Sequence, residues 1–195
     1  MDRTQALKLL QQNVKAENLF NHCLAVEAIM RGLARQLGED EDKFALTGLL
    51  HDIDYDQTAD DPQRHSAIGA AMLEQLGLAE DICYAVKVHN EAHGLPRLSV
   101  LDRALYAADP TSGFITAAAL IRPDKDLAAV ELKSLKKRFK EKSFARGANR
   151  EAMASCSELG LDLDAFLEIS LQSMKKIADE LGLQRKIGPI SGDTI

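Results

Sequence analysis

The chain has 195 residues, of which 46% are hydrophobic and 28% charged, and its net charge is −6. This length suits one domain with a full core, and the composition excludes a disordered or fibrous protein. The acidic balance argues against broad electrostatic binding to nucleic-acid polymers or anionic membranes, although a local basic patch could serve a phosphorylated small molecule. Runs of about 18 apolar residues and a signal-peptide pattern are both absent, so we expect a cytoplasmic protein.

The periodicity of the apolar residues predicts an all-α fold in a single domain. Leu and Ala are abundant, aromatic residues make up 5% of the chain and Trp is absent, which favours helix packing over a sheet core. Apolar residues recur at helical spacing in every long segment, and alternating strand patterns are missing. We expect the helical domain to span residues 1–183 and residues 184–195 to form a flexible tail.

The predicted helices follow one another with short connections. Their bounds are 4–14, 18–37, 39–51, 65–76, 79–89 and 99–120, then a basic helix that begins at 132, and finally 150–159 and 162–181. Thr4 is the predicted cap of the first helix, and Gly38 is expected to stop the second. Pro110 predicts a break or kink next to Asp109 in the helix 99–120.

The cysteines and Asp102 have structural interpretations. Cys23, Cys83 and Cys156 lie in apolar periodic segments, and we expect buried free thiols. Asp102 lies near a predicted helix start, so we interpret it as a helix-start charge or an ion-pair partner. These residues are therefore set aside from the candidate site.

A polar pair closes the apolar stretch of residues 44–50, within the sequence F-A-L-T-G-L-L-H-D-I-D-Y-D. The pair is His51 and Asp52. Burying an unpaired carboxylate costs roughly several kcal/mol, and the usual remedies are a hydrogen-bond network or a metal ion. Asp109 closes a second apolar run, A-L-Y-A-A-D, and the other four histidines lie within 45 residues of the pair. This concentration of ligand-type side chains indicates a metal site.

The order of these residues, H…HD…H…H…D, resembles the signature of the HD superfamily of metal-dependent phosphohydrolases over residues 18–114. That signature consists of a helix-borne histidine, a His-Asp doublet and a distal aspartate. The resemblance implies an all-helical fold in which His22, His51, Asp52 and Asp109 coordinate one divalent ion. It also implies that His51 and Asp52 lie at the reacting centre. The predicted helices in residues 126–183 are additions to this signature region.

The resemblance leaves open one or two ions, because a subset of HD proteins holds a second one. In HD proteins with two ions, histidines from the following helices bind the second ion while the doublet aspartate bridges; His65 and His89 match these positions, and His93 matches less closely. The chain departs from many relatives after the doublet, where I-D-Y-D replaces an Ile-Gly followed by a phosphate-contacting lysine. Asp54, in this acidic loop, is interpreted as a solvated or capping residue that lies near enough to His51 to support it.

The predicted ligand set indicates which metal ions the site favours. Imidazoles and carboxylates without thiolates favour Mn, Fe, Co, Ni or Zn over Cu(I), and several imidazoles argue against a site dedicated to Mg or Ca. Such an ion lowers the pKa of bound water from about 15.7 to roughly 7. The two additional histidines favour two ions over one.

The phosphate charge of a substrate must be met by cations. The candidates, which the sequence does not rank, are Arg64, Lys87, Arg103 and Arg146. The basic segment 133–150 is expected to be mostly a solvated helix face. Its loop, with Arg146 and Arg150, is the better candidate for contact with an anion.

These features predict a phosphohydrolase, acting on a phosphomonoester or phosphodiester, that attacks a small phosphorylated metabolite, a nucleotide in the first place, with metal-activated water. Two alternatives stay open: an HD-type di-iron oxygenase, and a metal- or ligand-sensing module without turnover. We expect no nucleic-acid polymer and no membrane as partners, and homo-oligomer formation is left open. Metal analysis, oxygen consumption and a phosphate-ester screen separate the three functions.

Overall fold

The computed structural model describes residues 1–184, and helices and turns account for the fold of this part without a strand. The helices are α1 (Arg3–Asn13), α2 (Glu17–Leu37), α3 (Glu41–Leu50), α4 (Tyr55–Thr58), α5 (Ala67–Gln75), α6 (Glu80–Val88), α7 (Val100–Leu120), α8 (Leu132–Phe139), α9 (Arg150–Ala154) and α10 (Leu163–Lys175). Three 3₁₀ helices are η1 (Glu91–His93), η2 (Leu127–Ala129) and η3 (Ser155–Leu159). The predicted all-α class is confirmed. The predicted flexible tail lies, from residue 185 onward, outside the described residues.

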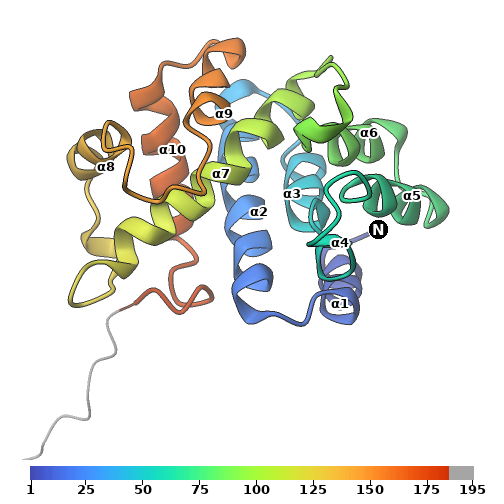
Figure 1. The fold of residues 1–195 in the computed structure, drawn as a ribbon, viewed down its shortest axis with the longest axis horizontal. Coiled ribbons are helices and arrows are strands. Elements are labelled where there is room, and N and C mark those ends of the chain that lie inside the picture. Colours follow the sequence, from blue (N-terminus) through green and yellow to red (C-terminus); the bar gives the residue numbers. More distant parts are fainter. Residues whose placement is uncertain (185–195) are drawn as a thin grey trace, which may run out of the picture.

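The two longest helices, α2 and α7, cross near the middle of the molecule (Figure 1). Helix α3 lies beside α2, with α5 and α6 on one side of this centre and α8 and α10 on the other. Buried residues of α2, α3, α6, α7 and α10 belong to one hydrophobic cluster. Within residues 1–184, no helix has both the length and the hydropathy that crossing a bilayer requires.

Local capping explains where the central helices begin and end. Gly38 adopts the left-handed conformation (φ 73°) that stops α2. Asp40 accepts hydrogen bonds from two backbone N–H groups at the start of α3. Ser99 and Asp102 form a capping box on α7, so Asp102 has the helix-start role expected of it. The predicted cap Thr4 is wrong, because Asp2 caps α1 by accepting a hydrogen bond from the N–H of Gln5.

Several predicted bounds also differ from the structure. The acidic loop contains the short helix α4, and α5 begins at Ala67, so His65 precedes the helix. Helix α10 ends at Lys175 and continues as turns to residue 182. Helix α7 runs through Pro110 without a break. A proline removes one helical hydrogen bond, and burial on both sides of Pro110 keeps the helix continuous.

The core is packed closely where α2 meets α3. An added Cβ on Gly48 would lie 2.9 Å from the carbonyl oxygen of Val26 and 2.9 Å from Cγ of Met30. Only glycine therefore allows this approach of the two helices. The three cysteines, Cys23, Cys83 and Cys156, are buried free thiols, as predicted.

The turn of residues 140–149, between α8 and α9, folds around Arg150. The guanidinium group donates hydrogen bonds to the carbonyl oxygens of Phe144 (2.7 Å) and Ala148 (2.8 Å), and to two further carbonyls at 3.4 Å. It also stacks over the ring of Phe114, 4.5 Å from the centroid. Arg150 is thus engaged by the protein itself, and the sequence-based interpretation of Arg150 as an anion-contacting residue is wrong.

We expect Gly48→Ala to destabilise the protein by about 1–3 kcal/mol, because the new methyl group meets backbone atoms that cannot turn away. Urea unfolding with a chelator present, so that metal binding does not contribute, measures the change. Gly113→Ala in α7 is the matched control, since no atom lies within 4 Å of its added Cβ. The control should gain about 0.5–1 kcal/mol through helix propensity. Equal effects of the two changes would contradict this account of the α2–α3 contact.

We expect Arg150→Lys to loosen residues 140–149, because a lysine cannot donate to several carbonyls in a planar fork. Loss of one charge-assisted hydrogen bond, about 1.5 kcal/mol, raises the open fraction of the turn roughly tenfold. Limited trypsin digestion should therefore cut faster at Lys142 and Arg146. Arg146→Lys, an exposed change that also keeps a trypsin site, should leave the rate unchanged. An unchanged rate in Arg150→Lys would show that other contacts hold the turn.

Candidate metal centre

The structure brings together six predicted ligand residues from separate parts of the chain. They are His22 in α2, His51 and Asp52 at the end of α3, His65 before α5, His89 at the end of α6, and Asp109 in the middle of α7. Three of these five elements deliver the side chain at or beside a helix terminus, whereas His22 and Asp109 lie inside α2 and α7. The continuity of α7 places the carboxylate of Asp109 opposite α2.

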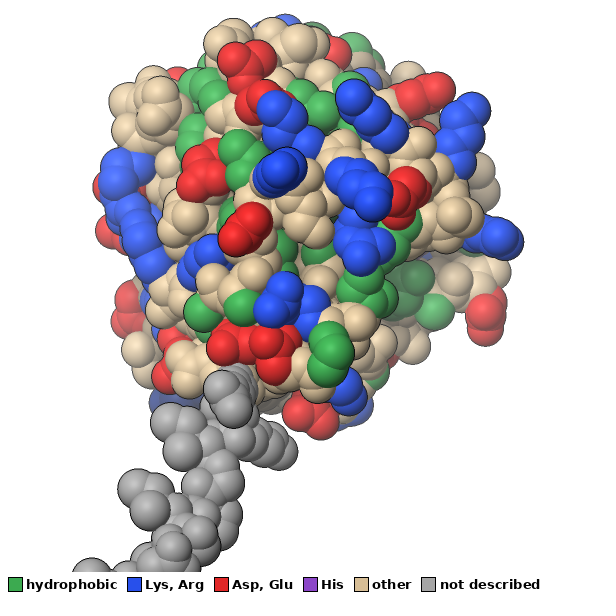
Figure 2. Space-filling model, turned by 90° about the vertical axis from the view of Figure 1, so that its left-hand side faces the viewer, with side chains coloured by type: hydrophobic (Ala, Val, Ile, Leu, Met, Phe, Trp, Pro, Cys, Tyr) green, Lys and Arg blue, Asp and Glu red, His purple; other side chains and the backbone are tan. Residues whose placement is uncertain are grey.

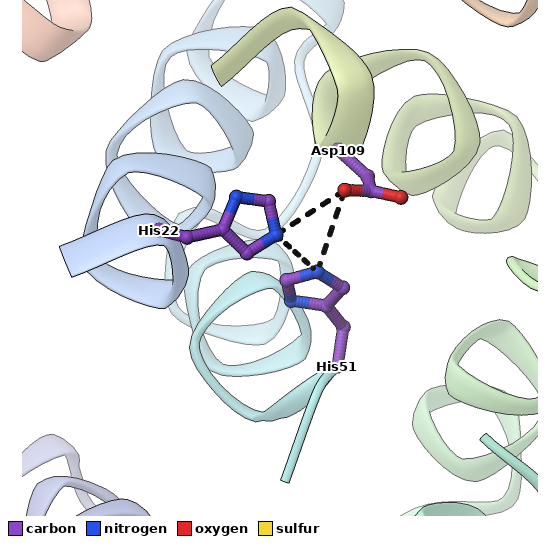
Figure 3. A group of neighbouring side chains, drawn as sticks. All are labelled: His22, His51 and Asp109. Atoms are coloured by element: carbon purple, nitrogen blue, oxygen red, sulfur yellow. Dashed lines mark hydrogen bonds and ion pairs between the residues drawn. The ribbon is translucent and has the colours of Figure 1, made fainter. Parts of the chain in front are cut away.

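The first group of three side chains is drawn in Figure 3. Nε2 of His22 lies 3.1 Å from Nε2 of His51 and 3.2 Å from Oδ1 of Asp109. Nε2 of His51 lies 3.8 Å from the same carboxylate oxygen. These three atoms are close enough to one another to hold one metal ion.

The carboxylate of Asp52 faces all four clustered histidines. Its Oδ1 lies 3.5 Å from Nε2 of His51, 3.4 Å from Nε2 of His65 and 3.4 Å from Nε2 of His89. Its Oδ2 lies 3.5 Å from Nε2 of His22. A second set of possible metal ligands thus comprises His51, Asp52 and His89. Asp52 directs one oxygen towards each side of the cluster.

Two of the histidines are oriented by the helices they terminate. Nδ1 of His51 donates to the carbonyl oxygen of Gly48 (2.8 Å), and Nδ1 of His89 donates to that of Val86 (2.6 Å). The last carbonyls of a helix have no partner within the helix, so an imidazole at the C-cap can bond the carbonyl three residues earlier. The helix end thereby fixes the ring and leaves Nε2 directed at the carboxylates.

A hydroxyl group orients the third histidine, His22. Its Nδ1 donates to Oγ of Ser112 (2.8 Å), and the Ser112 hydroxyl donates in turn to the carbonyl oxygen of Asp109 (2.9 Å). Ser112 is buried and lies one turn after Asp109 on α7. Sequence reasoning missed this residue, although its spacing of three residues from a candidate ligand is a usable signal.

Asp54 orients the fourth histidine, His65. Its Oδ1 accepts a hydrogen bond from Nδ1 of His65 (3.1 Å), and its Oδ2 accepts one from the backbone N–H of Gly69 (2.8 Å). The carboxylate is fully buried, and an added Cβ on Gly69 would lie 3.2 Å from Cγ of Asp54. The expectation that Asp54 is solvated is therefore wrong, and its contact is with His65 and not with His51.

His93 lies outside the cluster and holds the backbone beside it. Its Nε2 donates to the carbonyl oxygen of His65 (2.8 Å) and lies 3.0 Å from Oγ of Ser66. Asn90 donates to the same carbonyl of His65 (3.0 Å). Ser66 is buried and has a positive φ of 65°, a strained conformation for a residue other than glycine. Ser66 and Asn90 are positioning residues that sequence reasoning missed.

The hydrogen bonds at Nδ1 fix the tautomer of the four histidines and so leave Nε2 as the metal-binding atom. Because each Nδ1 carries its proton towards an acceptor, each neutral ring presents an Nε2 lone pair to the cluster. Two such lone pairs, on His22 and His51, face each other at 3.1 Å. This arrangement requires a cation or a proton between the rings, and the donor set fits a divalent metal ion.

The pKa of His51 and those of the two carboxyl groups are shifted in opposite directions, and both shifts favour the charged form. Burial disfavours a charged imidazole, but the carboxylates of Asp52 and Asp109 outweigh burial and raise the pKa of His51 to about 9. Burial opposes ionisation of the two carboxyl groups as well. The facing histidines nevertheless hold the pKa of Asp52 and that of Asp109 below the usual range. The cluster therefore attracts positive charge, which a metal ion supplies by replacing imidazole protons.

A cavity of about 290 Å³ opens beside the cluster. Its lining residues are His65, His89, Asn90, Glu91, Tyr106, Asp109, Pro110, Gly147, Asn149 and Ala152. None of the predicted phosphate-contacting residues Arg64, Lys87, Arg103 and Arg146 belongs to this lining. Arg103 lies 3.5 Å from the carboxylate of Glu158, and the other three are exposed. The polar side chains that a substrate in the cavity meets are therefore the candidate metal ligands, two asparagines, one tyrosine and the carboxylate of Glu91.

Comparison with known proteins agrees with this geometry. The family model described as HD domain matches residues 19–113. Ribonuclease Y of Oleidesulfovibrio alaskensis is 34% identical over 98 residues, which cover 50% of this chain and 18% of that protein. Ribonuclease Y of Thermotoga petrophila is 29% identical over 185 residues, which cover 89% of this chain and 34% of that protein. No solved structure matches the chain significantly.

The matched segment contains every residue of the cluster. It begins three residues before His22 and ends four residues after Asp109. The chain spans about a fifth to a third of the length of the curated relatives it matches. Residues 19–113 of this chain are therefore an HD domain.

Proposed function

We propose that this chain is a metal-dependent phosphohydrolase that cleaves a phosphate ester of a nucleotide. One observation carries the proposal: four imidazoles have Nδ1 bonded to fixed acceptors and Nε2 directed at the carboxylates of Asp52 and Asp109. Such preoriented nitrogen and oxygen donors suit Mn, Fe, Co, Ni or Zn. A divalent ion of this kind, when bound, supplies hydroxide at neutral pH and neutralises phosphoryl oxygens.

Two ions fit the cluster better than one. His22, His51 and Asp109 form one group of donors, and His89 with His65 extends the cluster on the other side of Asp52. Asp52 would bridge the two ions, because its two oxygens face opposite groups. The bridging carboxylate would also reduce the repulsion between the cations.

The cavity supports a substrate the size of a nucleotide. Its volume of about 290 Å³ is near the lower end of small-molecule sites. The side-chain amide of Asn149 can donate hydrogen bonds to a sugar or phosphate, whereas that of Asn90 is already bonded to the carbonyl oxygens of Pro62 and His65. Tyr106 adds an aromatic ring to the lining. Lysine and arginine are missing from the lining, so the metal ions would have to neutralise the phosphate charge.

The relatives named Ribonuclease Y favour a phosphodiester between nucleotides as the bond that is cleaved. The sequence pattern favours a small phosphorylated metabolite. Both interpretations place one nucleotide unit at the metal centre, and they differ in whether that unit is free or belongs to an RNA strand. Cytoplasmic location stays a prediction.

A screen with defined metal content tests the proposal. The purified chain is loaded separately with Mn, Fe(II), Co, Ni and Zn, and is assayed against nucleoside monophosphates, dinucleoside polyphosphates, a cyclic dinucleotide and a short RNA. Release of phosphate or nucleotide with at least one metal is expected. Oxygen uptake by the iron form without hydrolysis would assign the oxygenase alternative, and inactivity with every metal would assign a sensing module.

We expect Asp52→Ala to abolish both metal retention and hydrolysis, because it removes the carboxylate that all four histidines face. Asp54→Ala should lower activity by about 10- to 100-fold, since His65 loses the partner that orients it. Asp60→Ala, an exposed change in the same acidic loop, is the control and should match the wild type. Metal content and turnover are measured together, with circular dichroism as a check on folding. Full metal and activity in Asp52→Ala would refute the assignment of the centre.

We expect the His65→Ala, His89→Ala double variant to retain one ion where the wild type binds two. His22, His51 and Asp109 still offer three donors to the first ion. The measurement is elemental analysis after equilibrium dialysis against excess metal. The variant His93→Gln, which changes a histidine outside the cluster, keeps all six ligands and should retain more metal than the double variant. One ion per chain in the wild type, unchanged in the double variant, would reject the second ion.

A further inference from the structure

Positive charge is concentrated in one segment of this acidic protein. Residues 132–150 hold eight of the 24 Lys and Arg but one of the 30 Asp and Glu, so the segment carries +7 and the remaining chain −13. Figure 2 faces the side on which α8 lies, and Lys and Arg side chains gather over the upper part of this face. The segment also lies outside the HD domain at residues 19–113. The net charge of −6 therefore conceals a strongly basic surface.

Internal contacts leave most of these cations available to a ligand. Lys136 pairs with Asp164, Arg138 lies 3.7 Å from Glu141, and Arg150 is bonded to carbonyl groups. The remaining cations are exposed and have no ion-pair partner among residues 1–184. They are Lys133, Lys137, Lys140, Lys142 and Arg146, which we call the basic stripe.

Three residues of the basic stripe lie on one face of α8 and its C-cap. At about 100° per residue, Lys133, Lys137 and Lys140 fall within an arc of roughly 60°, opposite the fully buried Leu135. They extend over about 10 Å of the helix axis. A single phosphate cannot contact both ends of such a row, whereas a chain of phosphates can.

The basic stripe leads towards the metal centre. Lys140, Lys142 and Arg146 belong to the turn that Arg150 holds in place. The next part of the same turn supplies Gly147 and Asn149 to the wall of the cavity beside the cluster. One short segment thus connects the lysines of α8 with the site of the proposed reaction.

We propose that the basic stripe binds the phosphate backbone of a single-stranded RNA and directs one nucleotide of the strand into the cavity. Exposed lysines arranged in a row are the electrostatic footprint of such a partner. A membrane is disfavoured because the apolar residues of α8 face inwards, with Leu135 buried and Leu132 and Phe139 packed on the core. The choice of RNA rests on the proposed function, whereas the binding surface rests on charge and geometry.

Binding of a fluorescein-labelled 12-nucleotide single-stranded RNA to the full chain, followed by anisotropy between 50 and 300 mM salt, tests the proposal. A gel confirms that the RNA stays intact. The double variant Lys133→Gln, Lys137→Gln should weaken binding by about tenfold or more at 0.1 M salt and reduce the salt slope by about 1.4, or 0.7 per lost contact. The control, Lys8→Gln with Lys15→Gln, removes the same charge from exposed positions on α1 and the loop after it.

An RNA affinity that falls in the α8 variant alone supports the basic stripe. Absence of RNA binding by the wild type, or equal weakening in both variants, overturns it. Binding to vesicles with 30% phosphatidylserine but not to RNA also overturns it and assigns the surface to a membrane. Hydrolysis is measured separately, with the metal and substrate screen described above. If the chain hydrolyses none of those substrates with any metal yet the RNA affinity falls as expected, the proposed function fails while the basic stripe stands.

Discussion

Four imidazole nitrogens that point their lone pairs at two carboxylates form the constraint on which this structure depends. Without positive charge between them, the rings of His22 and His51 would face each other with repelling lone pairs. The protein does not relieve this by turning the rings, because each Nδ1 is already bonded to a fixed acceptor. The cost of assembling such a cluster is recovered only when a cation is present.

Three of the helix termini position side chains of the metal centre, and the interiors of α2 and α7 supply the other two. Helices α3 and α6 each finish with a histidine whose ring bonds a terminal carbonyl, so termination of the helix and orientation of the ligand are the same event. The close approach of α2 and α3 at Gly48 brings the α3 terminus, with His51, within reach of His22. The remaining ligand, Asp109, depends on α7 staying helical through Pro110. Packing, and not local propensity, secures that continuity.

Opposite charges lie in separate parts of the chain. The acidic remainder of the chain holds the cluster that attracts cations, whereas residues 132–150 present Lys and Arg side chains to solvent. Arg150 joins these parts, since its hydrogen bonds shape the turn that both borders the cavity and carries the exposed lysines. Net charge alone describes neither part, because opposite charges are separated along the chain.

The sequence by itself determined the all-α class, the ends of α2 and α3 and the buried thiols, because helical periodicity and capping residues are local signals. It also pointed to the six clustered residues, through the order of the histidines and of the His-Asp doublet. Three features were visible only in the tertiary structure. Asp54 is buried against His65, Ser112 orients His22, and the guanidinium group of Arg150 donates its hydrogen bonds to backbone carbonyl groups. Asp54 and His65 are 11 positions apart, Ser112 and His22 are 90 apart, and the carbonyl groups bonded to Arg150 lie 2 to 11 positions before it. Helical periodicity does not encode such contacts. For the same reason, the continuity of α7 through Pro110 was visible only once both of its halves were seen packed in the core.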